Sequence, residues 1–225
     1  MNIEKVFYSF CEKLKEREGF LSEDNVRFYW FAAMLKQDDE LNHYSLEEPY
    51  SNLKGKELDL MYYNEKQDLM CFEIKFHRKR DDNSLKNSPR TQAAGSLFND
   101  LLRLQTLQQY ENKKNVRYFF LYVNDNEMYD YLSKGEKETE EYRALLQNFY
   151  AEGEPTPKNI NNLIYSTKNK SETFFTNATK STGTNESIEI KGLKLLYKET
   201  FRCKSNSLTG INQNGVNCHV RLYEL

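Results

Sequence analysis

The chain has 225 residues, of which 38% are hydrophobic and 29% are charged. This length suits one large domain, or a core with an appendage, and is enough to bury a substantial core. The net charge of -2 argues against a histone-like or tail-type nucleic-acid binder, although an active site rich in carboxylates can offset a local basic surface.

Targeting signals and cysteine usage favour a cytoplasmic protein. The first twenty residues are charged throughout and lack the apolar stretch of a signal peptide. No apolar run approaches the length of a membrane span. The cysteines are widely separated, at Cys11, Cys71, Cys203 and Cys218. We therefore expect free thiols rather than two disulfides.

Two helices are expected at the start of the chain. Residues 3–18 repeat apolar side chains at three- and four-residue spacing, which predicts an amphipathic helix. Ser22 is a favourable N-cap for a second helix, which we expect to end near residues 36–37. Its first turn holds Glu23 and Asp24, where the helix dipole favours acids for structural reasons alone. A polar connection follows, part of which could form a short strand.

The stretch from Glu57 to Lys75 alternates apolar and polar residues around a short polar turn, which predicts an antiparallel hairpin. With the turn centred on Lys66, paired residue numbers sum to 132. Asp59 then faces Glu73, and Glu57 faces Lys75, where it could hold the lysine or serve as a further metal ligand. The apolar faces are expected to carry Leu58, Leu60 and Tyr62 on the first strand and Phe72, Ile74 and Phe76 on the second.

A helix and a buried strand are expected after the hairpin. The helix should begin near Thr91, and the apolar run Val116–Asn124 predicts a central strand. On the helix, Asp100 and Arg103 have the spacing of a surface pair or a helix–sheet contact. Helical periodicity returns at residues 128–132 and 138–150.

The composition changes at Pro155, after which the chain is rich in Asn, Ser, Thr and Lys. Strands are expected at Leu163–Tyr165, Thr173–Phe175, Ser187–Ile190, Leu193–Tyr197 and Val216–Tyr223. Together these elements predict an α/β protein with a mixed sheet. We expect a core over residues 1–154 and a β-rich C-terminal extension over residues 155–225 that packs on it; a single domain over 1–225 is the alternative.

The hairpin carries residues suited to phosphodiester hydrolysis. Asp59 and Glu73 supply carboxylate oxygens, the ligands that Mg²⁺ prefers, and the carbonyl of Ile74 could be a further ligand. A divalent cation lowers the pKa of a bound water and neutralises charge on the phosphate. Lys75 is placed to orient that water or to stabilise the developing charge. Amphipathic strands also produce this pattern by chance, with Glu73 and Lys75 facing solvent.

Asp59, followed by Glu73-Ile-Lys75 on the next strand, resembles the motif of the PD-(D/E)XK nuclease superfamily. The resemblance covers roughly residues 20–124. It implies a restriction-endonuclease-like αβββαβ core with a mixed sheet flanked by helices, and nuclease activity that depends on Mg²⁺, with Mn²⁺ as a substitute. Leu58 stands where the motif has a proline, a position that the superfamily keeps loosely.

The resemblance also assigns residues outside the hairpin. By position, Glu23 matches a catalytic acid on the preceding helix, with Asp24 as the close alternative. Gln92 matches a glutamine that some members carry on the helix after the lysine strand. Structural explanations compete with both assignments, because capping accounts for acids in a first helical turn and glutamine has many uses at a helix start.

A basic segment follows the lysine strand and predicts contact with nucleic acid. We expect contacts to the phosphate backbone from Arg78, Lys79, Arg80, Lys86 and Arg90, with Gln92 beside them. The alternative is a solvated loop, whose charge is diluted by Asp81 and Asp82.

The expected function is that of a bacterial, metal-dependent DNA nuclease, with restriction or phage defence as a role that the resemblance suggests. A homodimer is the default expectation, because restriction-type enzymes often dimerise to cut both strands. Three alternatives stay open: a non-catalytic module on the same fold that binds nucleic acid or protein, a nuclease acting on RNA, and an unrelated α/β protein with a chance motif. The last would place Asp59 and Lys75 far apart.

Overall fold

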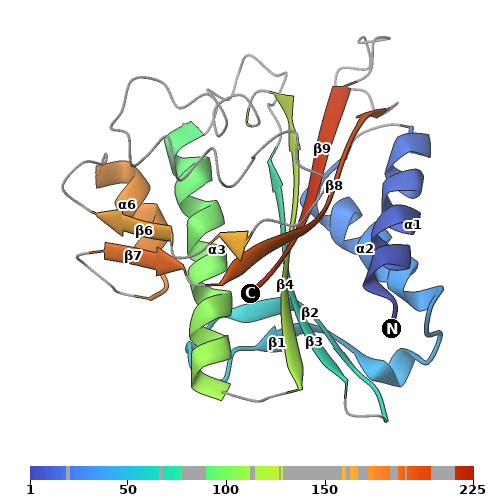
Figure 1. Ribbon diagram of the computed structural model, residues 1–225, viewed down its shortest axis with the longest axis horizontal. Helices are drawn as coiled ribbons and strands as arrows, with labels where there is room; N and C mark the ends of the chain where they lie inside the picture. The colour runs from blue at the N-terminus through green and yellow to red at the C-terminus, as the bar shows by residue number, and fades with distance from the viewer. Residues whose placement is uncertain are drawn as a thin grey trace.

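The computed structural model describes residues 1–18, 21–65, 68–77, 90–111, 115–126, 128, 159–160, 163–166, 172–182, 187–190, 192–203 and 216–225. Within these residues the protein is an α/β structure, in which helices lie on both faces of a seven-stranded mixed sheet (Figure 1). The predicted class, α/β with a mixed sheet flanked by helices, is therefore confirmed.

The first two helices form one of the layers. Helix α1 spans Ile3–Glu16 and helix α2 spans Glu23–Leu35. The predicted N-cap is present, since the Ser22 hydroxyl accepts a hydrogen bond from the Asn25 N–H and the Asn25 side-chain oxygen accepts one from the Ser22 N–H. Their apolar sides pack on the sheet, with Trp30 fully buried. The capping box thus sets where α2, and with it Glu23, begins.

Three strands follow the short 3-10 turn η1 (Leu41–His43). They are β1 (Tyr44–Pro49), β2 (Glu57–Tyr63) and β3 (Leu69–His77), paired antiparallel in that order. The β2–β3 pairs run from Leu60–Phe72 to Tyr63–Leu69, so the predicted sum of 132 is confirmed. The ladder ends at Leu60–Phe72, so it contains neither the predicted Asp59–Glu73 pair nor the predicted Glu57–Lys75 pair.

Successive side chains of β2 stop alternating between the two faces of the sheet at Asp59. Leu60 packs on the α1–α2 side of the sheet as expected, but Leu58 belongs to the core cluster on the side of the following helix. The expectation that Leu58 shares a face with Leu60 is therefore wrong. The reversal lies opposite Glu47, whose φ of 53° is unusual in a strand and which is skipped in the β1–β2 pairing.

Helix α3 (Arg90–Glu111) covers the opposite face of the sheet and leads into β4 (Val116–Asp125). Strand β4 pairs in parallel with β3 and lies between β3 and the C-terminal strand, as the apolar run predicted for a central strand. One apolar cluster fills each face: α3 packs on Phe120 and its neighbours, while Trp30 of α2 packs on Phe72.

The C-terminal strands complete the same sheet. Strand β9 (Val216–Glu224) pairs with β4, and β8 (Leu193–Cys203) pairs with β9 and with the short β5 (Asn159–Ile160). Outside α3 lie α6 (Glu172–Thr179) and a separate two-stranded sheet of β6 (Leu163–Ser166) and β7 (Ser187–Ile190) (Figure 1). Cys218, Val220 and Leu222 of β9 belong to the same apolar cluster as residues of β3 and β4.

Two expectations about the C-terminal region are wrong. Residues Thr173–Phe175 lie in helix α6 rather than in a strand, because a short apolar run does not by itself distinguish a helix from a strand. Helix α6 as a whole packs against α3. Cys203 and Cys218 are joined in a disulfide, while Cys11 and Cys71 are free and buried. The β8–β9 pairing places the two bonded cysteines with their Cα atoms 6.1 Å apart, within the range of a disulfide.

Two of the predicted helical segments lie wholly or largely outside the described residues. The helical periodicity at residues 138–150 lies outside the described residues, as does all but Met128 of the segment 128–132. Among the described residues, no helix is both long and apolar enough to cross a membrane.

Candidate functional site

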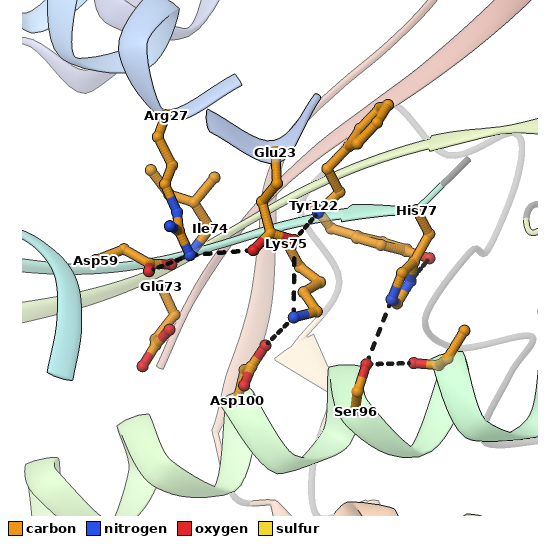
Figure 2. A network of polar contacts seen from close by, with 12 residues as sticks. Glu23, Arg27, Asp59, Glu73, Ile74, Lys75, His77, Ser96, Asp100 and Tyr122 are labelled. Carbon is orange, nitrogen blue, oxygen red and sulfur yellow. Dashed lines mark hydrogen bonds and ion pairs between the residues drawn. The ribbon is translucent and has the colours of Figure 1, made fainter. Parts of the chain in front are cut away.

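A group of charged residues, each buried or partly buried, lies where β2 and β3 stop pairing, between α2 and α3 (Figure 2). We call it the polar cluster, and it consists of Glu23, Arg27, Asp59, Glu73, Lys75, Asp100 and Arg103. Four carboxylates and three cationic groups leave it with a formal charge of -1. Charges so close to an apolar core cost stability, so they mark a site that chemistry could use.

The edge of β3 beyond Phe72 is capped by side chains instead of by β2, and we call this part the free edge of β3. The Ile74 N–H donates to Asp59 Oδ2 at 2.6 Å, and the Phe76 N–H donates to Glu23 Oε2 at 3.3 Å. Asp59 and Glu23 thus satisfy two backbone donors that a ladder would otherwise pair. This arrangement fixes both carboxylates against one short length of backbone.

Arg27 links the same two carboxylates. Its Nη2 atom lies 2.7 Å from Asp59 Oδ1 and 3.0 Å from Glu23 Oε1 (Figure 2). Its Nη1 atom lies 3.7 Å from Asp24 Oδ1, and the Asp24 side chain is 89% exposed. Burial raises the pKa of Asp59, and the Arg27 guanidinium acts against that rise. Of the two candidate acids in the first turn of α2, Glu23 and Asp24, Glu23 is therefore the one that belongs to the polar cluster.

Glu73 is the most deeply buried acid of the cluster, at 1% exposure. Both of its oxygens accept hydrogen bonds from Arg103 Nη2, at 2.8 and 2.9 Å, and the Tyr50 hydroxyl donates to Oε1. Burial raises the pKa of Glu73 well above its ordinary range, and the neighbouring Asp100 and Asp59 carboxylates raise it further. Its carboxylate depends on Arg103 for charge compensation.

Lys75 joins the two sides of the cluster. Its Nζ atom lies 3.2 Å from Asp100 Oδ2 on α3 and 3.7 Å from Glu23 Oε2 on α2. Burial by itself lowers the pKa of this lysine, but Asp100 and Glu23 outweigh it, so that the pKa is raised. The ammonium group therefore stays charged at neutral pH, which suits electrostatic stabilisation of a phosphate rather than proton abstraction.

His77 extends the polar contacts along β3. Its Nδ1 is 2.9 Å from the Tyr122 hydroxyl, and its Nε2 is 3.3 Å from the Ser96 hydroxyl (Figure 2). Burial and the Lys75 ammonium lower the pKa of His77 to about 3, so the imidazole is neutral. A neutral ring beside a charged lysine adds no competing positive charge to the cluster.

The fit of a divalent cation can be judged from the oxygen donors. Among the described residues, no three His, Cys, Asp or Glu side chains gather as a ready metal site. Mg²⁺ needs only one or two carboxylates and keeps several waters, so Asp59 and Glu23 are suitable. A strand residue directs its N–H and C=O to one edge, so the Ile74 carbonyl also faces the free edge. Glu73 fits less well, because Arg103 already engages both of its oxygens.

Four of the residues expected at the site come together: Glu23, Asp59, Glu73 and Lys75 all lie in the polar cluster. Glu23 contacts Lys75 directly and shares Arg27 with Asp59, so Asp59 and Lys75 are not placed far apart as the chance-motif alternative expected.

Other expected residues lie elsewhere. Glu57 is exposed and pairs with Pro49 of β1, so the expectation that it faces Lys75 is wrong, because the β2–β3 ladder ends three residues after it. Gln92 is exposed in the first turn of α3. Arg78, Lys79, Arg80 and Lys86 lie outside the described residues, as does the side chain of Arg90.

Sequence reasoning did not assign site roles to Arg27, Tyr50, Asp100 and Arg103. Asp100 and Arg103 were expected to form a surface pair or a helix–sheet contact. The structure shows the helix–sheet contact, with Asp100 buried and Arg103 partly buried. A signal was present, since Asp100 falls three residues after Leu97 and four before Leu104, on the core-facing side of α3. No comparable signal marked Arg27, whose spacing from Glu23 is common on exposed helices.

Comparisons with protein-family models, curated proteins and solved structures found no match to this chain. The fold and the polar cluster are therefore the observations on which a functional proposal must rest.

Proposed function

We propose that this chain is a metal-dependent nuclease that hydrolyses phosphodiester bonds in DNA. The observation that carries the proposal is the convergence of Glu23, Asp59, Glu73 and Lys75 in one partly buried cluster. These residues come from a helix and two strands, and packing them together costs desolvation energy that a purely structural core would avoid. The element order around them, α2-β1-β2-β3-α3-β4, supports the likeness to PD-(D/E)XK nucleases.

Each residue has a role that follows from its position. Asp59 and Glu23 would hold Mg²⁺ or Mn²⁺ with the Ile74 carbonyl, and the bound cation would supply an activated water and charge neutralisation. Lys75, kept charged by Asp100 and Glu23, stabilises negative charge on the phosphate. Glu73 anchors Arg103 and, through its negative charge, helps keep the cluster attractive to cations.

A cleavage assay on the full chain tests the proposal. Wild-type protein should cut DNA with Mg²⁺ or Mn²⁺ and not with EDTA, and Asp59→Asn and Lys75→Met should each reduce the rate by at least about a hundredfold. Glu57→Gln is the matched control, because it removes an exposed acid from the same strand as Asp59. Cleavage that survives both site substitutions would refute the assignment. Plasmid, linear, single-stranded and RNA substrates separate DNA from RNA cleavage.

A second candidate function is a non-catalytic module that binds nucleic acid or protein. The observation that favours it is that Asp59 and Glu73 are both ion-paired with arginines of the chain itself. Such pairing compensates the negative charges of these two carboxylates without a metal. This candidate predicts nucleic-acid affinity that is equal in EDTA and in Mg²⁺, without turnover of any substrate in the panel.

A further inference from the structure

We propose that Arg27 is an intramolecular competitor for the divalent cation, so that metal enters the site only as the Arg27 guanidinium leaves it. The inference rests on the proposed metal-dependent function and concerns the regulation of that site. It also assigns the cation to Asp59, Glu23 and the Ile74 carbonyl, with Glu73 left in its pair with Arg103.

The geometry places one cationic nitrogen where a cation would be held. Arg27 Nη2 contacts one oxygen of Asp59 and one of Glu23, at 2.7 and 3.0 Å. The second oxygen of each carboxylate is occupied by a backbone N–H of β3, from Ile74 and Phe76 respectively. The two oxygens that remain for a cation are therefore the two that Arg27 binds.

The position along β3 supports the same assignment. The carbonyl of Ile74 lies between the N–H groups of Ile74 and Phe76 in the order of the chain, and it faces the same edge. Two carboxylates and this carbonyl therefore converge on the free edge of β3, where the guanidinium now lies (Figure 2). Oxygen donors of these kinds suit Mg²⁺ and Mn²⁺.

The two arginines of the cluster differ in how easily they could be displaced. The Arg27 side chain is 33% exposed and its partner Glu23 is 31% exposed, whereas Arg103 and Glu73 are 14% and 1% exposed. The Nε atoms of Arg27 and Arg103 are both buried without a hydrogen bond, so the difference between the two arginines lies in their exposure. Asp24, 3.7 Å from Nη1 and largely in solvent, offers the displaced guanidinium a partner. Exchange at Arg27 is thus feasible without disturbing Glu73.

Cation binding to the full chain provides the test, with Mn²⁺ as the probe and electron paramagnetic resonance or calorimetry as the readout. Arg27→Met removes the guanidinium but keeps an apolar side chain of similar length. We expect its Mn²⁺ dissociation constant to fall by about tenfold, which corresponds to two partly exposed ion pairs. Arg117→Met, which removes an arginine paired with Glu224 at 2.6 Å outside the cluster, should bind as wild type does. Equal or weaker binding by Arg27→Met, or no binding by either protein, would overturn the inference.

A second measurement does not need Arg27→Met and therefore remains decisive if that variant does not fold. Wild-type protein labelled with ¹⁵N-arginine is titrated with Mg²⁺, and the Arg27 side-chain signal is assigned by its loss in a lightly perturbing variant, Arg27→Lys. We expect the Arg27 signal to shift with Mg²⁺ while the Arg117 signal stays in place. Mg²⁺ binding that leaves the Arg27 signal unchanged would contradict displacement.

The outcomes separate this inference from the proposed function. If Arg27→Met binds Mn²⁺ more tightly and no nucleic acid is cleaved, the competition stands and the nuclease proposal fails. If wild type cleaves DNA with Mn²⁺ and Arg27→Met has unchanged affinity, the nuclease proposal stands and the competition fails.

Discussion

Replacing Arg103 with methionine should destabilise the protein in a way that depends on pH. Arg103 Nη2 is the cationic donor to both oxygens of Glu73. Arg103 also pairs with Asp100, but Asp100 has a second cationic partner, Lys75 at 3.2 Å, which the substitution leaves in place. The substitution therefore isolates Glu73, whose one remaining side-chain hydrogen-bond donor among the described residues is the Tyr50 hydroxyl. Arg103 also lies over the Tyr50 ring, 5.6 Å from its centroid.

The magnitude follows from burial. Removing one partner of a buried ion pair costs about 3–5 kcal/mol, because the other charge is left uncompensated. Glu73 is 1% exposed, so this case applies. The pair Arg117–Glu224 provides the contrast, since Arg117 is 44% exposed and a pair of that kind contributes about 0–1 kcal/mol. Arg117→Met should therefore change the free energy of unfolding far less than Arg103→Met.

The pH dependence has a definite sign. The pKa of Glu73 is raised by burial, so the folded state holds more protons than the unfolded state between the ordinary carboxyl pKa and the raised one. The contribution of Glu73 to the free energy of unfolding is therefore largest below that interval and falls as pH rises through it, by up to about 1.4 kcal/mol per unit. Loss of Arg103 extends the interval upward, so the defect of Arg103→Met should shrink at acidic pH.

Urea unfolding measures these quantities, with fluorescence of the buried Trp30 as the signal. Wild type, Arg103→Met, Arg117→Met and the double variant Arg103→Met/Glu73→Gln are compared at about pH 5 and about pH 8. The double variant should recover much of the lost stability, because the buried charge is gone. A loss below about 1 kcal/mol for Arg103→Met, with the same value at both pH conditions, would refute the reasoning about Glu73.

Two further predictions concern residues in contact with the polar cluster or next to it on β3. Tyr50→Phe removes a hydroxyl that donates to Glu73, so the free energy of unfolding should fall by about 1.5–3 kcal/mol, measured by the same urea titration; an unchanged midpoint would show that this hydrogen bond contributes nothing. For His77, whose pKa is lowered to about 3, imidazole NMR signals should show a neutral ring throughout neutral and mildly acidic pH. Because the unfolded chain takes up that proton near pH 6.5, the His77 contribution to stability should be lost progressively as pH falls toward 3; an imidazole titrating near its ordinary pKa would contradict this.

Much of the site could be predicted because it depends on short stretches of chain. The β2–β3 register followed from alternation on either side of a short turn, since a one-residue slip would move every apolar side chain to the wrong face. The start of α2 followed from Ser22, whose hydroxyl caps a donor three residues away. Together these local features placed Asp59, Glu73 and Lys75 on neighbouring strands.

The reversal at Leu58 marks where local reasoning stopped working. Strict alternation holds only while a strand stays paired in regular geometry, and the unusual backbone at Glu47 interrupts it opposite Asp59. Next to this point the β2–β3 ladder also ends, so Glu57 is not paired with Lys75. The free edge of β3 is capped by side chains instead. Nothing in the period-2 pattern announces such a break.

The amino-acid sequence by itself determined the acids, the lysine and the strands that carry them, because these depend on residues near one another in the chain. Only the tertiary structure decided which cation holds which acid. Glu73 and Arg103 are 30 residues apart, and the Phe76 N–H finds Glu23 across 53 residues. Such partners are chosen by how α2 and α3 pack on the two faces of the sheet. That packing depends on the whole apolar core, to which the C-terminal strand β9 also contributes.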